Sequence, residues 1–309
     1  MTPSEIQYYT PDDIPPEVLA YEAELRQLGV GKAGKVGALA LTLEESCGKT
    51  VMKEQFSKIP LYVQRALYLE ESLPSMAYLY VISVSEGILQ GDRYRIDIAL
   101  KNNARAHVTT TGATKLYSME RNYATQIVNI SLDDGCYLEY VPDQIIPYAH
   151  SRFYQKTSFK VHNNSTLLYS EMVVPGRVAH GESFDYDVCY LKTLARNQSD
   201  ELTFVDIARL IPKGGILKTL GILGDYDVFG TIYIVTGKKY LQELKSAVNS
   251  AREKFPNVSV GVTALPHDSG LLIRILGNRA DEIKKFNYEV VGIVRKLVLD
   301  APFSGVRKS

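Results

Sequence analysis

The hydrophobic residues of this chain recur at every second position over most of residues 35–211, which is the period of a strand with one buried face. One clear example is Arg93–Leu100, whose apolar set is Tyr94, Ile96, Ile98 and Leu100. Another stretch, Ala77–Val84, is apolar on both faces and predicts a strand that is covered on each side. This pattern predicts a mainly β fold.

Turn signals divide the β region into repeated units. Asn102-Asn103, Asp133–Gly135 and Asn163-Asn164 lie about thirty residues apart, and tight turns favour these residue types. Each signal separates two alternating strands, which gives the units Tyr94–Thr110, Gln126–Val141 and Tyr154–Val174. A lone hairpin is marginal in water, so we expect a coiled or solenoid-like stack of β-hairpins. Regular spacing within an ordinary β-sandwich is the alternative.

The pattern changes in the last part of the chain, about residues 231–300. Apolar positions there alternate between the strand period and the helix period, in the order β-α-β-β-α. The expected elements are Thr231–Val235, Lys238–Phe255, Val258–Thr263, Gly270–Leu276 and Arg279–Leu299. We expect a small C-terminal α+β layer that contains two helices and closes one side of the β body.

Residues 1–34 are expected to form a helical extension, separate from a β-rich domain of residues 35–309. A short helix is predicted to begin near Pro16, after acidic residues that favour a helix start, and to end at Gly29. Its apolar stripe consists of Val18, Tyr21, Leu25 and Leu28. The stripe packs on the chain's own domain or serves as an arm for a partner, and the sequence leaves both open.

Composition narrows the class of protein. The formal net charge is +0, which gives no reason to expect binding to nucleic acid or to an acidic membrane surface. No apolar run is long enough to span a membrane and no secretory signal segment is visible, so we expect a soluble, cytoplasmic protein. Cys47, Cys136 and Cys189 are odd in number and far apart, which argues against a disulfide framework.

The motifs of common enzymes are missing from the sequence. Cys136 sits in a strand pattern without a local base to activate it, and no GxSxG elbow or recognisable triad order occurs. Asp185 and Asp187 are paired carboxylates on one strand face, a feature that polar outer faces also have. The residues leave open a β-barrel hydrolase that acts through Asp and Glu, and a β-module that binds a small ligand.

Several residues able to bind a metal ion gather around glycines and prolines in the middle of the chain. They are Asp92, Glu139, His150, Glu171, His180 and Glu182. Imidazole suits nickel and zinc, whereas carboxylates hold such ions more weakly, so carboxylates along a passage would let an ion move on. Each of these residues can instead form a salt bridge or a turn cap, and Arg152 and Arg177 are available as partners.

A set of short motifs carries a resemblance to a known family. The sequence LEYVPDQIIPY (Leu138–Tyr148), followed by GRVAHGE (Gly176–Glu182), resembles the urease accessory proteins of the UreD/UreH family. Further matching stretches are PLYVQRALYLEE (Pro60–Glu71), GILQGD (Gly87–Asp92), TTTGATKLY (Thr109–Tyr117) and GLLIRILG (Gly270–Gly277). The resemblance implies a non-enzymatic scaffold that helps to deliver nickel to apo-urease, in a complex with a UreF-type partner and a UreG-type GTPase. Nickel would be in transit only, through an internal polar tunnel, with no cofactor held permanently.

The same resemblance selects the site residues. Asp92, Glu139 and Glu182 fall on family motif positions and are the expected transient nickel path, while Lys115 and Arg177 fall on motif positions as tunnel lining or framework. Arg152, His150 and His180 complete the expected framework, and the two histidines match no motif position. One departure concerns this region, because Glu86 stands where the family often has a glycine.

Overall fold

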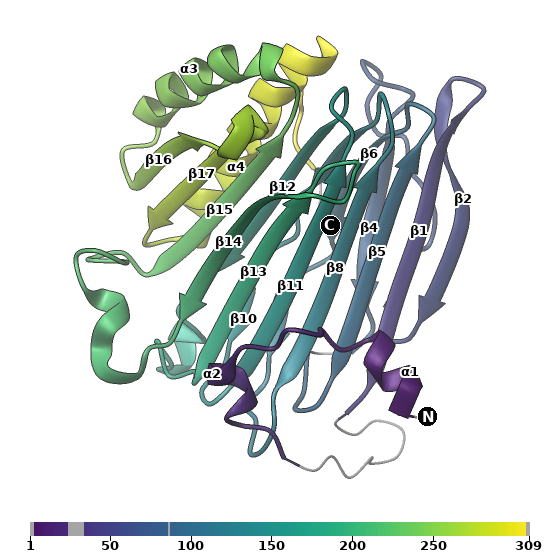
Figure 1. The fold of residues 1–309 in the computed structure, drawn as a ribbon. Helices are drawn as coiled ribbons and strands as arrows, with labels where there is room; N and C mark the ends of the chain where they lie inside the picture. Colours follow the sequence, from purple (N-terminus) through teal and green to yellow (C-terminus); the bar gives the residue numbers. More distant parts are fainter. Residues whose placement is uncertain (1–2, 24–33, 86, 307–309) are drawn as a thin grey trace.

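The computed structural model describes residues 3–23, 34–85 and 87–306. In this part of the chain two β-sheets lie face to face, and helices α3 (Leu241–Ala251) and α4 (Ala280–Leu299) cover the outer face of the second sheet (Figure 1). No helix among the described residues is long and apolar enough to cross a membrane. The result is a three-layer arrangement in which the second sheet is covered on both faces.

The strands follow one another across each sheet in a regular order. In the described chain the first sheet has the order β14 (Leu202–Leu210), β13 (Val188–Arg196), β11 (Arg152–Val161), β8 (Ala124–Leu132), β5 (Arg93–Lys101), β1 (Val36–Ser46) and β2 (Lys49–Lys58). The second has the order β16 (Val258–Ala264), β17 (Gly270–Gly277), β15 (Val228–Val235), β12 (Thr166–Val173), β9 (Tyr137–Tyr140), β6 (Arg105–Thr110), β4 (Ala77–Ser83) and β3 (Leu61–Tyr62). Two short strands, β7 (Thr114–Leu116) and β10 (Ile145–Pro147), attach beside β12.

The predicted repeat is the structural unit of the fold, and the prediction of a solenoid-like stack is confirmed. The units differ from the expected hairpins, because the two strands of each unit pair with neighbouring units instead of with each other. The two strands of each unit lie in facing sheets, and each strand pairs in parallel with the equivalent strand of the next unit, as β5, β8 and β11 do. Each unit is therefore one coil of the stack. Because alternation puts one face of every strand inward, apolar side chains from both sheets meet between them in a continuous core.

The turns between the two strands of a coil stack on one another as well. Asn102 and Asn103 adopt φ values of 53° and 58°, and Gly135 in the next coil has φ 71°. A Cβ added to Gly135 would lie 1.9 Å from Oδ1 of Asn103. Glycine is required there for its positive φ and for the close approach of the neighbouring turn.

The C-terminal layer also follows the prediction. Strands β15, β16 and β17 and helices α3 and α4 occur in the expected order, and both helices begin and end within a few residues of the expected positions. Ile283, Phe286 and Val290 on α4 are fully buried against the second sheet. This second core fixes the helices to the sheet.

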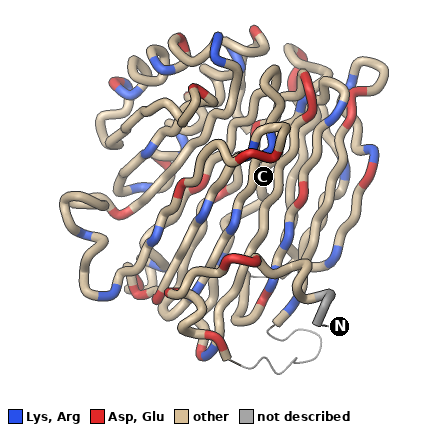
Figure 2. The backbone as a smooth tube through the Cα atoms, in the orientation of Figure 1, with Lys and Arg blue, Asp and Glu red and all other residues tan. Residues whose placement is uncertain are grey.

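The N-terminal segment crosses the outer face of the first sheet (Figures 1 and 2). Its helix α2 (Pro16–Leu19) buries Val18 completely, and a carboxylate oxygen of Asp13 lies 2.6 Å from Nζ of Lys192 on β13. The expected start near Pro16 is correct, but the helix ends at Leu19 instead of continuing to Gly29. The remaining apolar positions, Leu25 and Leu28, lie outside the described residues. A preceding short helix, α1 (Pro3–Tyr8), was not expected.

The stacked turns yield a test of the coil geometry. Gly135→Ala is expected to lower the free energy of unfolding by about 1–3 kcal/mol, because alanine is strained at this φ and its Cβ overlaps Asn103. Gly261→Ala on edge strand β16 is the matched control, since its added Cβ meets nothing within 4 Å. Urea denaturation of both variants measures the effect. Equal stability of the two variants would contradict this account.

Candidate functional site

A cavity of about 270 Å³ lies between the two sheets. Its outer end is lined by a loop of the TTTGATKLY motif, in which Thr111, Gly112 and Lys115 are exposed. Its inner end is lined by buried Gln155 and Glu171. The cavity therefore leads from the surface to a carboxyl group in the interior of the sandwich.

Strand register places the polar lining of the first sheet in one row. Tyr94 on β5, Gln126 on β8 and Gln155 on β11 are successive cross-strand partners, and all three line the cavity. Nε2 of Gln126 donates to Oε1 of Gln155 at 3.0 Å. Since parallel coils repeat in register, a polar residue at one position of each coil produces a polar row that crosses the strands.

Among the described residues, Glu171 has only neutral partners in direct contact. It is 5% exposed, and its Oε1 accepts hydrogen bonds from Nε2 of Gln155 at 2.7 Å and from the hydroxyl of Tyr169 at 3.0 Å. Burial raises the pKa of Glu171 to about 7, and these two hydrogen bonds oppose the rise only in part. Glu171 can therefore gain or lose a proton near neutral pH.

Polar side chains continue beyond Glu171 along the strand register of the second sheet. Glu171 on β12 pairs across the sheet with Thr231 on β15, which pairs with Arg274 on β17. Arg274 donates to both oxygens of Asp206 on β14 at 2.6 and 2.7 Å, and so ties the second sheet to the first. We call the row from Tyr94 through Gln126, Gln155 and Glu171 to the Asp206–Arg274 pair the polar seam.

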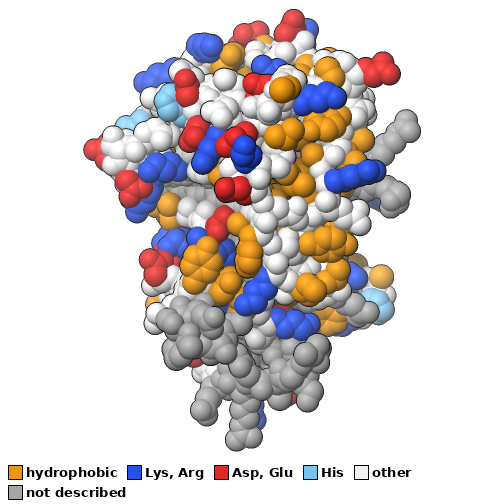
Figure 3. All heavy atoms as spheres, turned by 90° about the vertical axis from the view of Figure 1, so that its right-hand side faces the viewer, with side chains coloured by type: hydrophobic (Ala, Val, Ile, Leu, Met, Phe, Trp, Pro, Cys, Tyr) orange, Lys and Arg blue, Asp and Glu red, His pale blue; other side chains and the backbone are white. Residues whose placement is uncertain are grey.

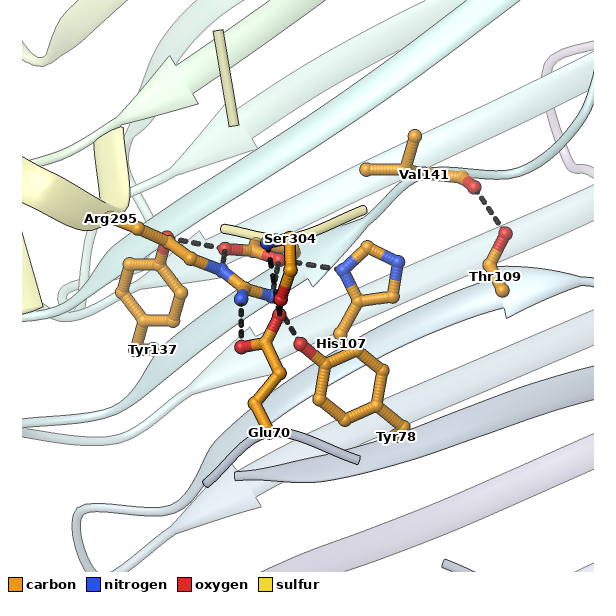
Figure 4. A network of polar contacts seen from close by, with 9 residues as sticks. Glu70, Tyr78, His107, Thr109, Tyr137, Val141, Arg295 and Ser304 are labelled. Atoms are coloured by element: carbon orange, nitrogen blue, oxygen red, sulfur yellow. Dashed lines mark hydrogen bonds and ion pairs between the residues drawn. The ribbon is translucent and has the colours of Figure 1, made fainter. Parts of the chain in front are cut away.

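Glu139 lies on the other face of the second sheet, beneath α4. It is 0% exposed and accepts hydrogen bonds from Nε and Nη2 of Arg295 at 2.5 and 2.7 Å, while Nδ1 of His107 lies 2.6 Å away (Figure 4). Arg295 also donates to Glu70 at 2.5 Å and to the hydroxyl of Tyr78 at 2.8 Å. The loop containing Glu70, strands β4, β6 and β9, and helix α4 all contribute to this network.

The network holds Glu139 in its charged form. Burial opposes ionisation, but the hydrogen bonds from Arg295 and His107 outweigh it and lower the pKa of Glu139 to about 2. The carboxylate has its oxygens occupied and faces away from the cavity between the sheets. These contacts give Glu139 the role of an anchor for α4.

Asp92 is a buried loop carboxylate next to the cavity wall. It is 0% exposed and accepts hydrogen bonds from the backbone N–H of Lys35 at 2.8 Å and of Leu89 at 2.9 Å. The hydroxyl of Tyr94, which lines the cavity, donates to it at 3.2 Å. Burial raises the pKa of Asp92, and the backbone donors counteract this. Its contacts hold the GILQGD loop in place.

Glu182 and Arg177 form an ion pair within the GRVAHGE loop. Nε of Arg177 donates to Oε2 of Glu182 at 2.9 Å, and the Arg177 guanidinium lies 4.1 Å from the centre of the Tyr148 ring. The hydrogen bond from Arg177 lowers the pKa of Glu182. Glu182 also accepts a hydrogen bond from the backbone N–H of Ala149 at 3.2 Å, so the pair joins two loops.

The remaining expected framework residues lie near the surface. Nε of Arg152 donates to Asp187 at 2.6 Å, and Nδ1 of His150 lies 3.8 Å from the same carboxylate. The side chain of His150 is 72% exposed, and His180 is exposed in a short 3-10 turn. Of this set, Lys115 alone is a lining residue of the cavity.

The three expected nickel-path residues therefore do not share one site: Asp92 is bound by backbone N–H groups, Glu139 by Arg295 and Glu182 by Arg177. Within residues 3–23, 34–85 and 87–306, no group of three or more His, Cys, Asp or Glu side chains is arranged to hold a metal ion. The polar seam instead depends on Gln126, Gln155 and Asp206, which lie outside the motifs, and on Arg274, which lies within GLLIRILG but was not expected to be a site residue. The available signal was a polar residue at an inward position of an alternating strand, which becomes visible once strand register is known.

Comparison with known proteins places these observations in a family. The family described as "UreD urease accessory protein" matches residues 35–308. The urease accessory protein UreD of Cenarchaeum symbiosum (strain A) is 41% identical over 282 residues, which cover 91% of this chain and 99% of that protein. Urease accessory protein UreD 2 of Brucella canis is 37% identical, covering 87% and 89%, and UreD of Yersinia pseudotuberculosis serotype O:1b is 34% identical, covering 96% and 94%.

The Arg295 network gives a first prediction for this region. Arg295→Met is expected to cost about 3–5 kcal/mol of unfolding free energy, because it leaves Glu139 and Glu70 buried without their cation. The neighbouring Lys296→Met, at a side chain that is 69% exposed, is the control and should change stability by less than about 0.5 kcal/mol. Thermal and urea unfolding measure both. A loss for Arg295→Met no greater than that of the control would show that the network adds nothing.

Glu171 gives a second prediction, on pH. Its folded pKa of about 7 lies above the ordinary value of 4.5, so the folded state holds the proton more tightly and wild-type stability falls as pH rises between these values. Glu171→Gln removes this term. Its unfolding free energy relative to wild type should therefore increase by up to roughly 3 kcal/mol from pH 4.5 to pH 7 and stay level above.

Urea denaturation at a series of pH values measures this difference. The control is Glu243→Gln, at an exposed residue of α3, whose difference from wild type should remain within about 0.5 kcal/mol throughout. A pH-independent difference for Glu171→Gln would mean that the buried carboxyl has an ordinary pKa.

Proposed function

The chain belongs to the UreD family of urease accessory proteins, and on this premise we propose that it acts as a non-enzymatic scaffold that passes nickel toward apo-urease through the polar seam. The cargo would travel between the two sheets, from the exposed loop at Thr111–Lys115 past Glu171. Nickel is then a substrate in transit and not a resident cofactor.

The observation that carries the proposal is the environment of Glu171. A buried carboxyl group without a cationic partner in direct contact is costly to fold, and such groups concentrate at functional sites. Glu171 lines the cavity, and within the described part of the chain its hydrogen-bond donors are a glutamine and a tyrosine. A divalent cation would replace its proton and supply the missing charge.

The chemistry of the lining suits transit better than storage. Amide, hydroxyl and carboxyl oxygens bind nickel more weakly than imidazole or thiolate does. Tyr94, Gln126 and Gln155 offer such oxygens at successive steps, one from each coil. A cation in this row would exchange between neighbouring weak sites, shielded from chelators in bulk water by the two sheets.

The proposed partners are a UreF-type accessory protein, a UreG-type GTPase and the apo-urease subunits. Apolar side chains at the end of the sandwich formed by β2, β3 and β4 support work within a complex, since Phe56, Ile59 and Val84 are 55%, 76% and 56% exposed (Figure 3). Val84 lies between Ser83 and Ser85, which line the cavity. A protein covering this surface would border the outer end of the seam.

The expected site residues are proposed as the frame around the path. Asp92, Glu139 and Glu182 are bound to other groups of the chain, and we propose that Asp92 holds the cavity wall through Tyr94. The hydrolase and ligand-binding alternatives find less support. Asp187, one of the paired carboxylates considered for hydrolysis, is engaged by Arg152.

A reconstituted urease activation assay tests the proposal. The full-length chain is combined with apo-urease, its other accessory proteins and nickel, and urease activity and bound nickel are measured. Glu171→Gln is expected to reduce the rate of nickel incorporation at least tenfold while leaving complex assembly intact, because the amide cannot carry the charge that a cation needs. Glu243→Gln, on the surface of α3, should behave as wild type.

Two results would count against the proposal. If urease is activated equally well without this chain, the accessory role itself is wrong for this protein. If Glu171→Gln transfers nickel at the wild-type rate, the seam is not the route. Size-exclusion chromatography of the mixture separates a transfer defect from a failure to assemble.

A further inference from the structure

Arg274 occupies an unusual place at the end of the polar seam. Its Nη2 contacts both oxygens of Asp206, its Nη1 donates to Oγ1 of Thr231 at 2.6 Å, and its guanidinium lies 5.2 Å from the centre of the Phe229 ring. The side chain is 32% exposed and that of Asp206 is 18% exposed. The guanidinium thus bridges the two sheets close to the surface.

Register puts this bridge directly in line with the inner end of the cavity. Glu171, Thr231 and Arg274 are successive cross-strand partners on the inner face of the second sheet. Asp206 also accepts a hydrogen bond from the hydroxyl of Tyr233 at 2.5 Å, and Tyr233 in turn stacks on Tyr169 beside Glu171. A polar route from Glu171 across β15 toward β17 and the facing strand β14 therefore meets Arg274.

We propose that Arg274 is the plug of the polar seam, a positive group that closes the β14–β17 end to cations until its guanidinium is drawn away from Asp206. The inference rests on the proposed function and assigns to that path a residue that controls release. In the closed arrangement Arg274 neutralises Asp206, so this carboxylate is not available as a step for the cargo.

The plug can open without unfolding the core. About a third of the Arg274 side chain is accessible, so a carboxylate of a docked protein can compete with Asp206 for the same guanidinium. Once the guanidinium leaves, Asp206 on the facing strand β14 loses its cationic partner, and a divalent cation gains a second carboxylate site beyond Glu171. Opening and cation release are thereby coupled through one ion pair.

Nickel binding by the full-length chain tests the plug directly. Equilibrium dialysis against Ni²⁺ is expected to show at least tenfold tighter binding for Arg274→Gln than for wild type, because the variant exposes Asp206. Arg274→Lys retains the charge and should stay within about twofold of wild type. The double variant Arg274→Gln/Asp206→Asn should lose the gain.

Each outcome decides the matter. Unchanged binding in Arg274→Gln, or a gain that persists in the double variant, overturns the plug and leaves Arg274 as a tie between sheets. Circular dichroism checks folding. If Arg274→Gln is unfolded, Thr231→Val serves instead, since it keeps the charge and the volume but removes one anchor; a gain of at least threefold is then expected, and no gain overturns the proposal.

The activation assay separates this inference from the proposed function. With the partners and apo-urease present, the wild-type chain should protect nickel from EDTA, so that urease activation is nearly the same with and without the chelator. With Arg274→Gln, added EDTA should reduce urease activation at least sixfold. If activation never depends on the chain, the proposed function fails whatever the variants do. If wild type activates and both proteins are equally sensitive to EDTA, only the plug fails.

Discussion

The cost of placing a carboxylate away from water organises this protein. Glu139 and Glu171 lie on adjacent strands of the same sheet, β9 and β12, and both are almost completely buried. They face opposite sides. Glu139 meets a guanidinium and an imidazole under α4, whereas Glu171 meets a glutamine and a tyrosine between the sheets. The same residue type is thus fixed in one place and left titratable in the other.

The two faces of the second sheet therefore have different roles: the outer face stabilises the fold, and the inner face carries the titratable carboxyl group. The charge network of Arg295 locks the helical layer, the loop containing Glu70 and the second sheet into one body. The inner face of that sheet is then free to carry polar groups without loosening the fold. Because its walls are held by backbone hydrogen bonds and by a packed layer behind, the cavity can keep its shape when a cargo enters or leaves.

The sequence predicted the coils and the C-terminal layer because their signals are local. Regularly spaced turn residues and a change from the strand period to the helix period can be recognised without knowing which strands are paired. The polar seam depends on contacts distant in sequence. Arg274 lies 68 residues from Asp206 and Arg295 lies 156 residues from Glu139, and only the stacking of coils brings them together. Gln126 and Gln155 occupy inward positions of alternating strands, but only the register shows that they lie side by side in one row.

The motif residues illustrate the same limit. Asp92 and Glu182 occupy family positions, and their spacing alone allows a ligand or a structural role. In the structure the first receives backbone N–H groups and the second an arginine of its own loop, which are contacts that shape the walls. Parallel stacking has one more consequence for those walls. Each coil adds a single rung to the row of Tyr94, Gln126 and Gln155, at an interstrand rise of roughly 4.8 Å. The length of this row of the polar seam is therefore set by the number of coils. Duplication or loss of one coil would lengthen or shorten the row by one residue and leave the other residues of the row unchanged.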